Sequence, residues 1–167
     1  MKKIIVILAA AVMLISAASC GKENPENNTN SNVTVSNSQT SKTCREIYNN
    51  VTNVVEFPEM VFLQEKSLSN RYGIESNMYT DYVFATAQEA TLADTVVIIK
   101  TNSQDNKDAV VGKLNAFISQ SQETNVDYNP DQYQIIKDAS VKTSGDFVYL
   151  VFSKDRETVE QIISEAL

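Results

Sequence analysis

One stretch of six residues, TVVIIK at 95–100, constrains the fold of this chain more than any other. Four β-branched apolar residues follow one another in it, so an extended strand would be apolar on both of its faces. Such strands are typical of the centre of a sheet that is covered on both sides. Asp94 precedes the stretch, and Asn102 and Ser103 follow it closely. We therefore expect residues 95–100 to form a central, fully buried strand.

An amphipathic helix is expected after Thr43. Thr43-Cys44-Arg45-Glu46 has the pattern of a capping box, in which the threonine and the glutamate satisfy each other's backbone amides. Apolar residues then recur at helical spacing: Ile47, Val51, Val54 and Val55. Pro58 ends this helix. A second short helix is expected over 64–72, with Gly73 as the left-handed residue that closes it.

Alternating apolar residues predict a strand over 79–88, before the central strand. A long helix is expected after the central strand, capped by Ser103 or Asn102. A short helix is then expected with Asn129 as its cap and Pro130 in its first turn. Residues 140–152 predict a hairpin that turns at Ser144-Gly145. A last helix is expected after Ser153, with that serine as its cap.

The order strand–strand–helix occurs twice, over about 80–121 and 139–166. Two alternatives stay open here, namely duplication of one unit and the convergence of short strand-to-helix stretches. In either case the sequence predicts an α+β fold. We expect a four-stranded antiparallel sheet with helices packed mainly on one face.

The first 19 residues have the organisation of an export signal. Lys2 and Lys3 precede a run over 4–18 that is apolar except for one serine. This run is too short for a comfortable membrane span, which needs roughly 20 apolar residues. The small residues at 17–19 suit cleavage by a signal peptidase, and Cys20 follows them directly.

This boundary resembles the lipobox of bacterial lipoproteins, with Ala17 where leucine is most usual. The resemblance implies that Cys20 receives a diacylglyceryl group and becomes the new N-terminus after removal of residues 1–19. It also implies a protein anchored to the outer face of the cytoplasmic membrane through its lipid. The alternative is an ordinary secreted protein in which Cys20 has no such role.

Asparagine, serine and threonine dominate residues 20–43, and only two valines there are apolar. Such a composition cannot form a core, so we expect a flexible tether with a root-mean-square reach of about 26 Å. Ordered structure is then expected as a single domain over 44–167.

Composition excludes several classes of function. The formal charge is −7, and loss of Lys2 and Lys3 would leave 12 basic and 21 acidic residues, a charge of −9. An acidic protein repels phosphate backbones, so we expect no nucleic-acid partner. The chain has no histidine and only four scattered glycines, which argues against a zinc site and against a glycine-rich phosphate loop. We expect no metal and no cofactor.

No arrangement of residues predicts a catalytic site, and we expect a binding or interaction module rather than an enzyme. Its partner would be a protein or an extracellular ligand, together with the membrane that holds its anchor. The alternative is a cell-envelope hydrolase that uses paired carboxylates, with Glu56, Glu59, Asp127 and Asp131 as candidates. Cys44 would be the remaining thiol, and the simplest interpretation of it is an unreactive side chain.

Five short motifs in the predicted domain carry a further resemblance: EFPEM, RYGI, ADTVVIIK, YNPDQY and GDFVYLVFS. Together they resemble the bacterial lipoprotein family catalogued as domain of unknown function 4358, over roughly residues 45–167. The resemblance implies a surface-anchored α+β domain of Gram-positive bacteria. It implies no substrate, cofactor or catalytic residue.

Overall fold

The computed structural model describes residues 42–167, so Cys20, the predicted signal peptide and nearly all of the predicted tether lie outside the described residues. Five α-helices, five strands and one short 3₁₀-helix make up the described part of the chain. In chain order they are α1 (Cys44–Thr52), β1 (Met60–Phe62), α2 (Glu65–Tyr72), η1 (Ser76–Met78), β2 (Tyr79–Ala87), β3 (Thr95–Thr101), α3 (Gln104–Tyr128), α4 (Pro130–Ile136), β4 (Lys142–Ser144), β5 (Phe147–Phe152) and α5 (Arg156–Ala166).

The strands form one antiparallel sheet in the order β1-β2-β3-β5-β4. The antiparallel α+β prediction is confirmed, but the sheet has five strands rather than four. The missed strand is β1, which follows Pro58 and is only three residues long. So short a stretch shows no alternation of its own. It becomes a strand because the nine-residue β2 offers it a free edge for pairing.

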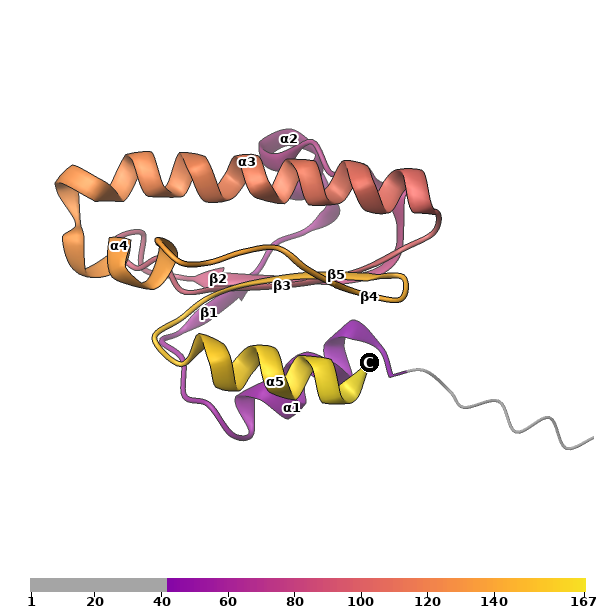
Figure 1. Cartoon of the computed structure of the whole chain (residues 1–167), viewed down its shortest axis with the longest axis horizontal. Helices are drawn as coiled ribbons and strands as arrows, with labels where there is room; N and C mark the ends of the chain where they lie inside the picture. Colours follow the sequence, from indigo (N-terminus) through magenta and orange to yellow (C-terminus); the bar gives the residue numbers. More distant parts are fainter. Residues whose placement is uncertain (1–41) are drawn as a thin grey trace, which may run out of the picture. The chain divides into compact units, whose positions relative to one another are not determined.

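The predicted burial of the central strand is confirmed. Val96 and Ile98 of β3 belong to a core beneath α1 and α5, whereas Val97 and Ile99 belong to a core beneath α2, α3 and α4. All four side chains are fully buried. Figure 1 shows the sheet between these two layers of helices.

The expectation of helices mainly on one face is therefore wrong. β5 is apolar at every position and pairs with β3 along its whole length. Two adjacent strands that are apolar on both faces would expose a continuous apolar surface to solvent if no helices covered one face. The amphipathic helices α1 and α5 cover that second face with the residues Ile47, Val51, Val159 and Ile163.

The two strand–strand–helix units, β2-β3-α3 and β4-β5-α5, have opposite hands. α3 packs on one face of the sheet and α5 on the other. Each unit can be viewed from the side of the sheet that carries its own helix, with its second strand pointing up. In the first unit β2 then lies on one side of β3, whereas in the second unit β4 lies on the opposite side of β5. No rotation superposes mirror-related arrangements, so the fold does not support duplication of one folded unit.

Local signals at the helix starts are largely confirmed. The Thr43 hydroxyl accepts from the Glu46 amide at 3.2 Å, and the Glu46 carboxylate accepts from the Thr43 amide at 2.8 Å. Ser103 caps α3 in the same way, by accepting from the Asn106 amide at 3.2 Å. Ser153 is not the cap of α5, because its hydroxyl accepts from the amide of the actual cap residue, Asp155. There the chain needs an extra turn before the helix begins.

Replacing glycine by alanine should have opposite effects on stability at Gly73 and at Gly112. Gly73 closes α2 with φ 65°, and a Cβ there would lie 3.0 Å from the Lys113 ammonium, whereas Gly112 lies within α3 with open space around it. We expect Gly73→Ala to lower the free energy of unfolding by about 1 kcal/mol because alanine strains the left-handed conformation. Gly112→Ala should raise it by about 0.5–1 kcal/mol because alanine favours a helix. Urea unfolding of both variants checks this, and shifts of the same sign would contradict the assignment.

Candidate functional site

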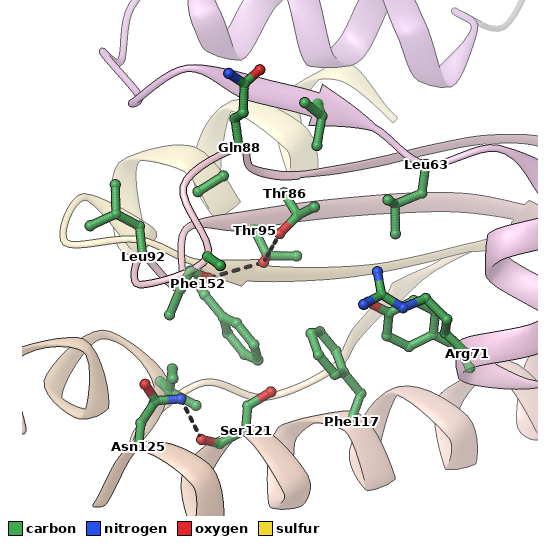
Figure 2. Close-up of a pocket in the computed structure, with 16 residues that line it drawn as sticks. Leu63, Arg71, Thr86, Gln88, Leu92, Thr95, Phe117, Ser121, Asn125 and Phe152 are labelled. Carbon is green, nitrogen blue, oxygen red and sulfur yellow. Dashed lines mark hydrogen bonds between the residues drawn. The ribbon is translucent and has the colours of Figure 1, made fainter. Parts of the chain in front are cut away.

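A groove of about 390 Å³ opens between α3 and the β1-β2 side of the sheet. A helix with its side chains is about 10 Å wide and covers about two strands that are spaced 4.8 Å apart. α3 packs mainly over β3 and β5, and on the same face Val61 of β1 and Thr86 of β2 line the space that remains beside it. The loop between β2 and β3 and the end of α2 enclose the sides of this space (Figure 2).

Aromatic rings form the apolar wall of the groove. Tyr72 contacts Phe84 and Phe117 with ring centroids 4.6 and 5.0 Å apart, and Phe117 contacts Phe152 at 5.3 Å. These residues come from α2, β2, α3 and β5. Figure 2 shows the rings of Phe117 and Phe152 pointing toward each other across the middle of the groove. The contacts hold the rings in place, so this wall is preformed rather than assembled on binding.

Side chains from the start of α4 hold the loop over 88–94 that borders the groove. The Gln132 amide oxygen accepts from the Ala93 backbone amide at 2.7 Å, and the Asn129 amide nitrogen donates to the Thr91 carbonyl at 2.8 Å. The YNPDQY motif thus has a structural role, because its two amide side chains fix this loop. These two hydrogen bonds hold one border of the groove in place.

Neutral polar groups line the remainder of the groove. Thr95 donates from its hydroxyl to the Ala93 carbonyl at 3.0 Å and lies 3.5 Å from the Thr86 hydroxyl. On α3, Asn125 donates from its side chain to the Ser121 carbonyl at 2.8 Å. The hydroxyls and amide groups add hydrogen-bonding capacity beside an apolar wall, which is the usual composition of a ligand site.

Arg71 is the only charged residue among the described residues that line the groove. It lies in the last turn of α2, is exposed, and extends toward Phe117 (Figure 2). Burial raises the pKa of the neighbouring Tyr72, and the positive charge of Arg71 partly offsets this rise. The groove therefore carries one positive charge among its described lining residues, on a chain whose formal charge is −7.

The groove is lined mostly by apolar and neutral polar side chains. Its described lining residues include hydroxyls but no carboxylate, lysine or thiol that could serve as a base or a nucleophile. Across residues 42–167 no group of three or more metal-ligating side chains comes together. The chemistry that this geometry supports is recognition by stacking, hydrogen bonding and a single positive charge.

None of the four carboxylates that were candidates for a hydrolase lines the groove. Glu56 and Glu59 line two different shallow hollows on either side of Pro58. Asp127 and Asp131 are exposed on either side of the turn that joins α3 to α4. Glu59 does share its hollow with Glu89, and both side chains are exposed. A glycosidase instead encloses its two carboxyl groups around the scissile bond.

Cys44 is fully buried in the first turn of α1. Its backbone amide donates to the Asp81 carboxylate at 2.7 Å. Burial, and secondarily the charge of Asp81, raise the pKa of the Cys44 thiol to about 12. A thiol that stays protonated at neutral pH is a poor nucleophile, so the geometry favours the expected unreactive side chain.

Sequence reasoning did not find the groove, because its walls come from residues far apart in the chain. Arg71 and Tyr72 stand in the RYGI motif, and Phe152 stands in GDFVYLVFS, but neither motif indicates that these residues meet. The one signal in the sequence that could have indicated the groove is the presence of aromatic residues on the inward faces of several elements, such as Tyr72, Phe117 and Phe152. The predicted lipidation site, Cys20, lies outside the described residues, and within 42–167 no helix is both long and apolar enough to cross a bilayer.

Comparison with known proteins gives one family. No curated protein and no solved structure matches the chain. The model of the family described as Domain of unknown function (DUF4358) matches residues 53–153. The five quoted motifs and every residue that lines the groove fall inside this range. The match spans more than half of the 167 residues, and the chain belongs to this family of domains of unknown function.

Proposed function

We propose that this protein is an extracytoplasmic lipoprotein whose domain binds a ligand in the groove beside α3, without catalysing a reaction. The observation that carries the binding role is the groove itself. It combines a preformed aromatic wall with neutral polar groups and one cation. That combination supports recognition, and its lining residues offer no pair of groups for acid–base or nucleophilic chemistry.

The N-terminal sequence supports the location. A positive start, a short apolar run and small residues lead directly to Cys20, as in lipoproteins that are processed at such a cysteine. An anchor with two or more acyl chains holds a protein stably, whereas one chain binds only marginally. Residues 20–43 would then hold the binding domain at a root-mean-square distance of about 26 Å from the bilayer, where it meets ligands at the cell surface.

Photo-crosslinking in the native membrane tests the binding role. Benzoylphenylalanine replaces Gln88, an exposed residue that lines the groove, in the full-length chain. A matched variant carries it at Thr143, which is exposed on β4 at the far edge of the sheet. After illumination we expect a defined increase in the intact mass of the Gln88 variant. No such increase should occur for the Thr143 variant.

The same experiment can contradict the proposal. Identical adducts from both positions would mean that capture depends on the probe and not on the groove. A Gln88 variant that is folded and illuminated in its own membrane but acquires no defined mass would remove the groove as a binding site.

A further inference from the structure

The class of ligand that fits the groove follows from its charge. The only charged group among its described lining residues is the Arg71 guanidinium, and the hollow that continues the groove along α3 also has Arg71 as its single charged residue. No ion pair or hydrogen bond within residues 42–167 engages the Arg71 side chain. A chain with 21 acidic residues thus has a ligand-sized groove that is free of carboxylates and keeps one unpaired cation at its mouth.

Arg71 also lies where a basic residue stabilises a helix, in the last turn of α2. That role requires only that the positive charge be near the helix end. It does not require the side chain to line the groove beside the aromatic wall, as that of Arg71 does (Figure 2). Lys113 of α3 lies near the same helix end, since its ammonium is close to Gly73, and it does not line the groove. The two cations therefore separate an effect on α2 from an effect on the groove.

The aromatic wall defines the other part of the ligand. Tyr72 and Phe117 meet edge to face with an interplanar angle of 83°, and each is partly exposed to the groove. Partly exposed aromatic rings gain most from covering by a flat or apolar body. The hydroxyl and amide groups of Ser121 and Asn125 lie along the α3 side of this wall, where they can contact the edge of such a body.

We infer that the groove binds a small amphiphilic anion, with its planar or apolar body on the Tyr72–Phe117 wall and its anionic group on Arg71. This inference rests on the proposed binding function and specifies the ligand class. A guanidinium forms two parallel hydrogen bonds with a carboxylate, and equally with a phosphate or sulfonate. Long-range repulsion by the acidic chain would oppose an anion elsewhere on the surface, so recognition depends on this local cation.

Two fluorescent probes with related aromatic bodies test the inference on the full-length protein. Anilinonaphthalene sulfonate carries an anionic group, and phenylnaphthylamine does not. We expect saturable binding of both. Arg71→Gln should weaken binding of the sulfonate about tenfold, or about 1.4 kcal/mol, which is typical of a lost charge-assisted hydrogen bond. It should leave binding of the neutral probe unchanged.

Lys113→Gln is the matched control, because it removes the same charge near the same helix end. We expect it to leave the affinity for both probes within a factor of two. Competition by benzoate and by phenyl phosphate then distinguishes a carboxylate ligand from a phosphate ligand. Arg71 lies on the surface, so its variant should fold, and circular dichroism verifies this.

Each other outcome of the probe experiment contradicts a specific part of the inference. If both probes bind and Arg71→Gln weakens neither, or weakens both equally, the anionic class is wrong and the binding groove stands. If Lys113→Gln acts as strongly as Arg71→Gln, the effect belongs to the charge of α2 and not to a ligand contact. If neither probe binds saturably, the groove is not a binding site for such bodies and the proposed function loses its site.

Discussion

Ile98→Ala and Ile99→Ala should each lower the free energy of unfolding by about 3 kcal/mol, within the 2–5 kcal/mol that is usual for loss of a buried isoleucine. The two residues are neighbours on β3 and both are fully buried. Ile98 points into the core under α1 and α5, and Ile99 points into the core under α3. Each substitution therefore leaves a cavity in a different layer, and urea unfolding of the two variants measures the cost.

This comparison tests the covering of both faces directly. A sheet with helices on one face would leave one of the two side chains exposed, and its replacement would then cost little. Thr143→Ala, at an exposed position on β4, is the control and should change stability by less than about 0.5 kcal/mol. A small effect at Ile98 beside a large one at Ile99 would contradict the layer formed by α1 and α5.

Cys20→Ser should move the protein out of the membrane fraction and abolish its labelling by an alkyne-bearing fatty acid. The proposed anchor depends on a thioether at this cysteine, and serine cannot form it. Loss of two or more acyl chains removes stable anchoring altogether, which makes this the largest change in behaviour expected of any single substitution. Fractionation of cells and in-gel fluorescence of the labelled protein measure the two effects.

Cys44→Ser is the matched control, because the chain has two cysteines and the second is buried in α1. It should leave both the membrane fraction and the fatty-acid label unchanged. Equal membrane fractions for the Cys20 variant and the native chain, with the label retained, would contradict lipidation at Cys20. The protein would then be better described as secreted.

Features that depend on near neighbours in the chain were predictable. The capping box at Thr43, the cap at Ser103 and the closure of α2 by Gly73 each involve residues within about one helical turn. The prediction of Ser153 as the cap of α5 was wrong by two residues, because the chain makes a turn before this helix and the cap is Asp155. Val54 was placed on the apolar stripe of α1, yet it is 67% exposed, because the helix ends at Thr52.

The sequence by itself determined that β3 must be covered on both faces, because the order of its side chains along an extended backbone places apolar groups on each side. It could not determine which helices supply the cover. An amphipathic helix has one apolar stripe and packs equally well on any apolar face, so the assignment of α1 and α5 to one side and α3 to the other follows from the connections between elements.

Only the tertiary structure decided the fifth strand, the opposite hands of the two strand–strand–helix units and the groove. β1 exists because an edge of β2 is free, and the groove exists because α3 packs mainly over β3 and β5 and leaves space above Val61 of β1 and Thr86 of β2. Arg71 and Phe152 lie far apart in the chain and meet at one groove only after the sheet has formed. Local patterns cannot encode such a meeting, because its free energy comes from contacts between distant residues.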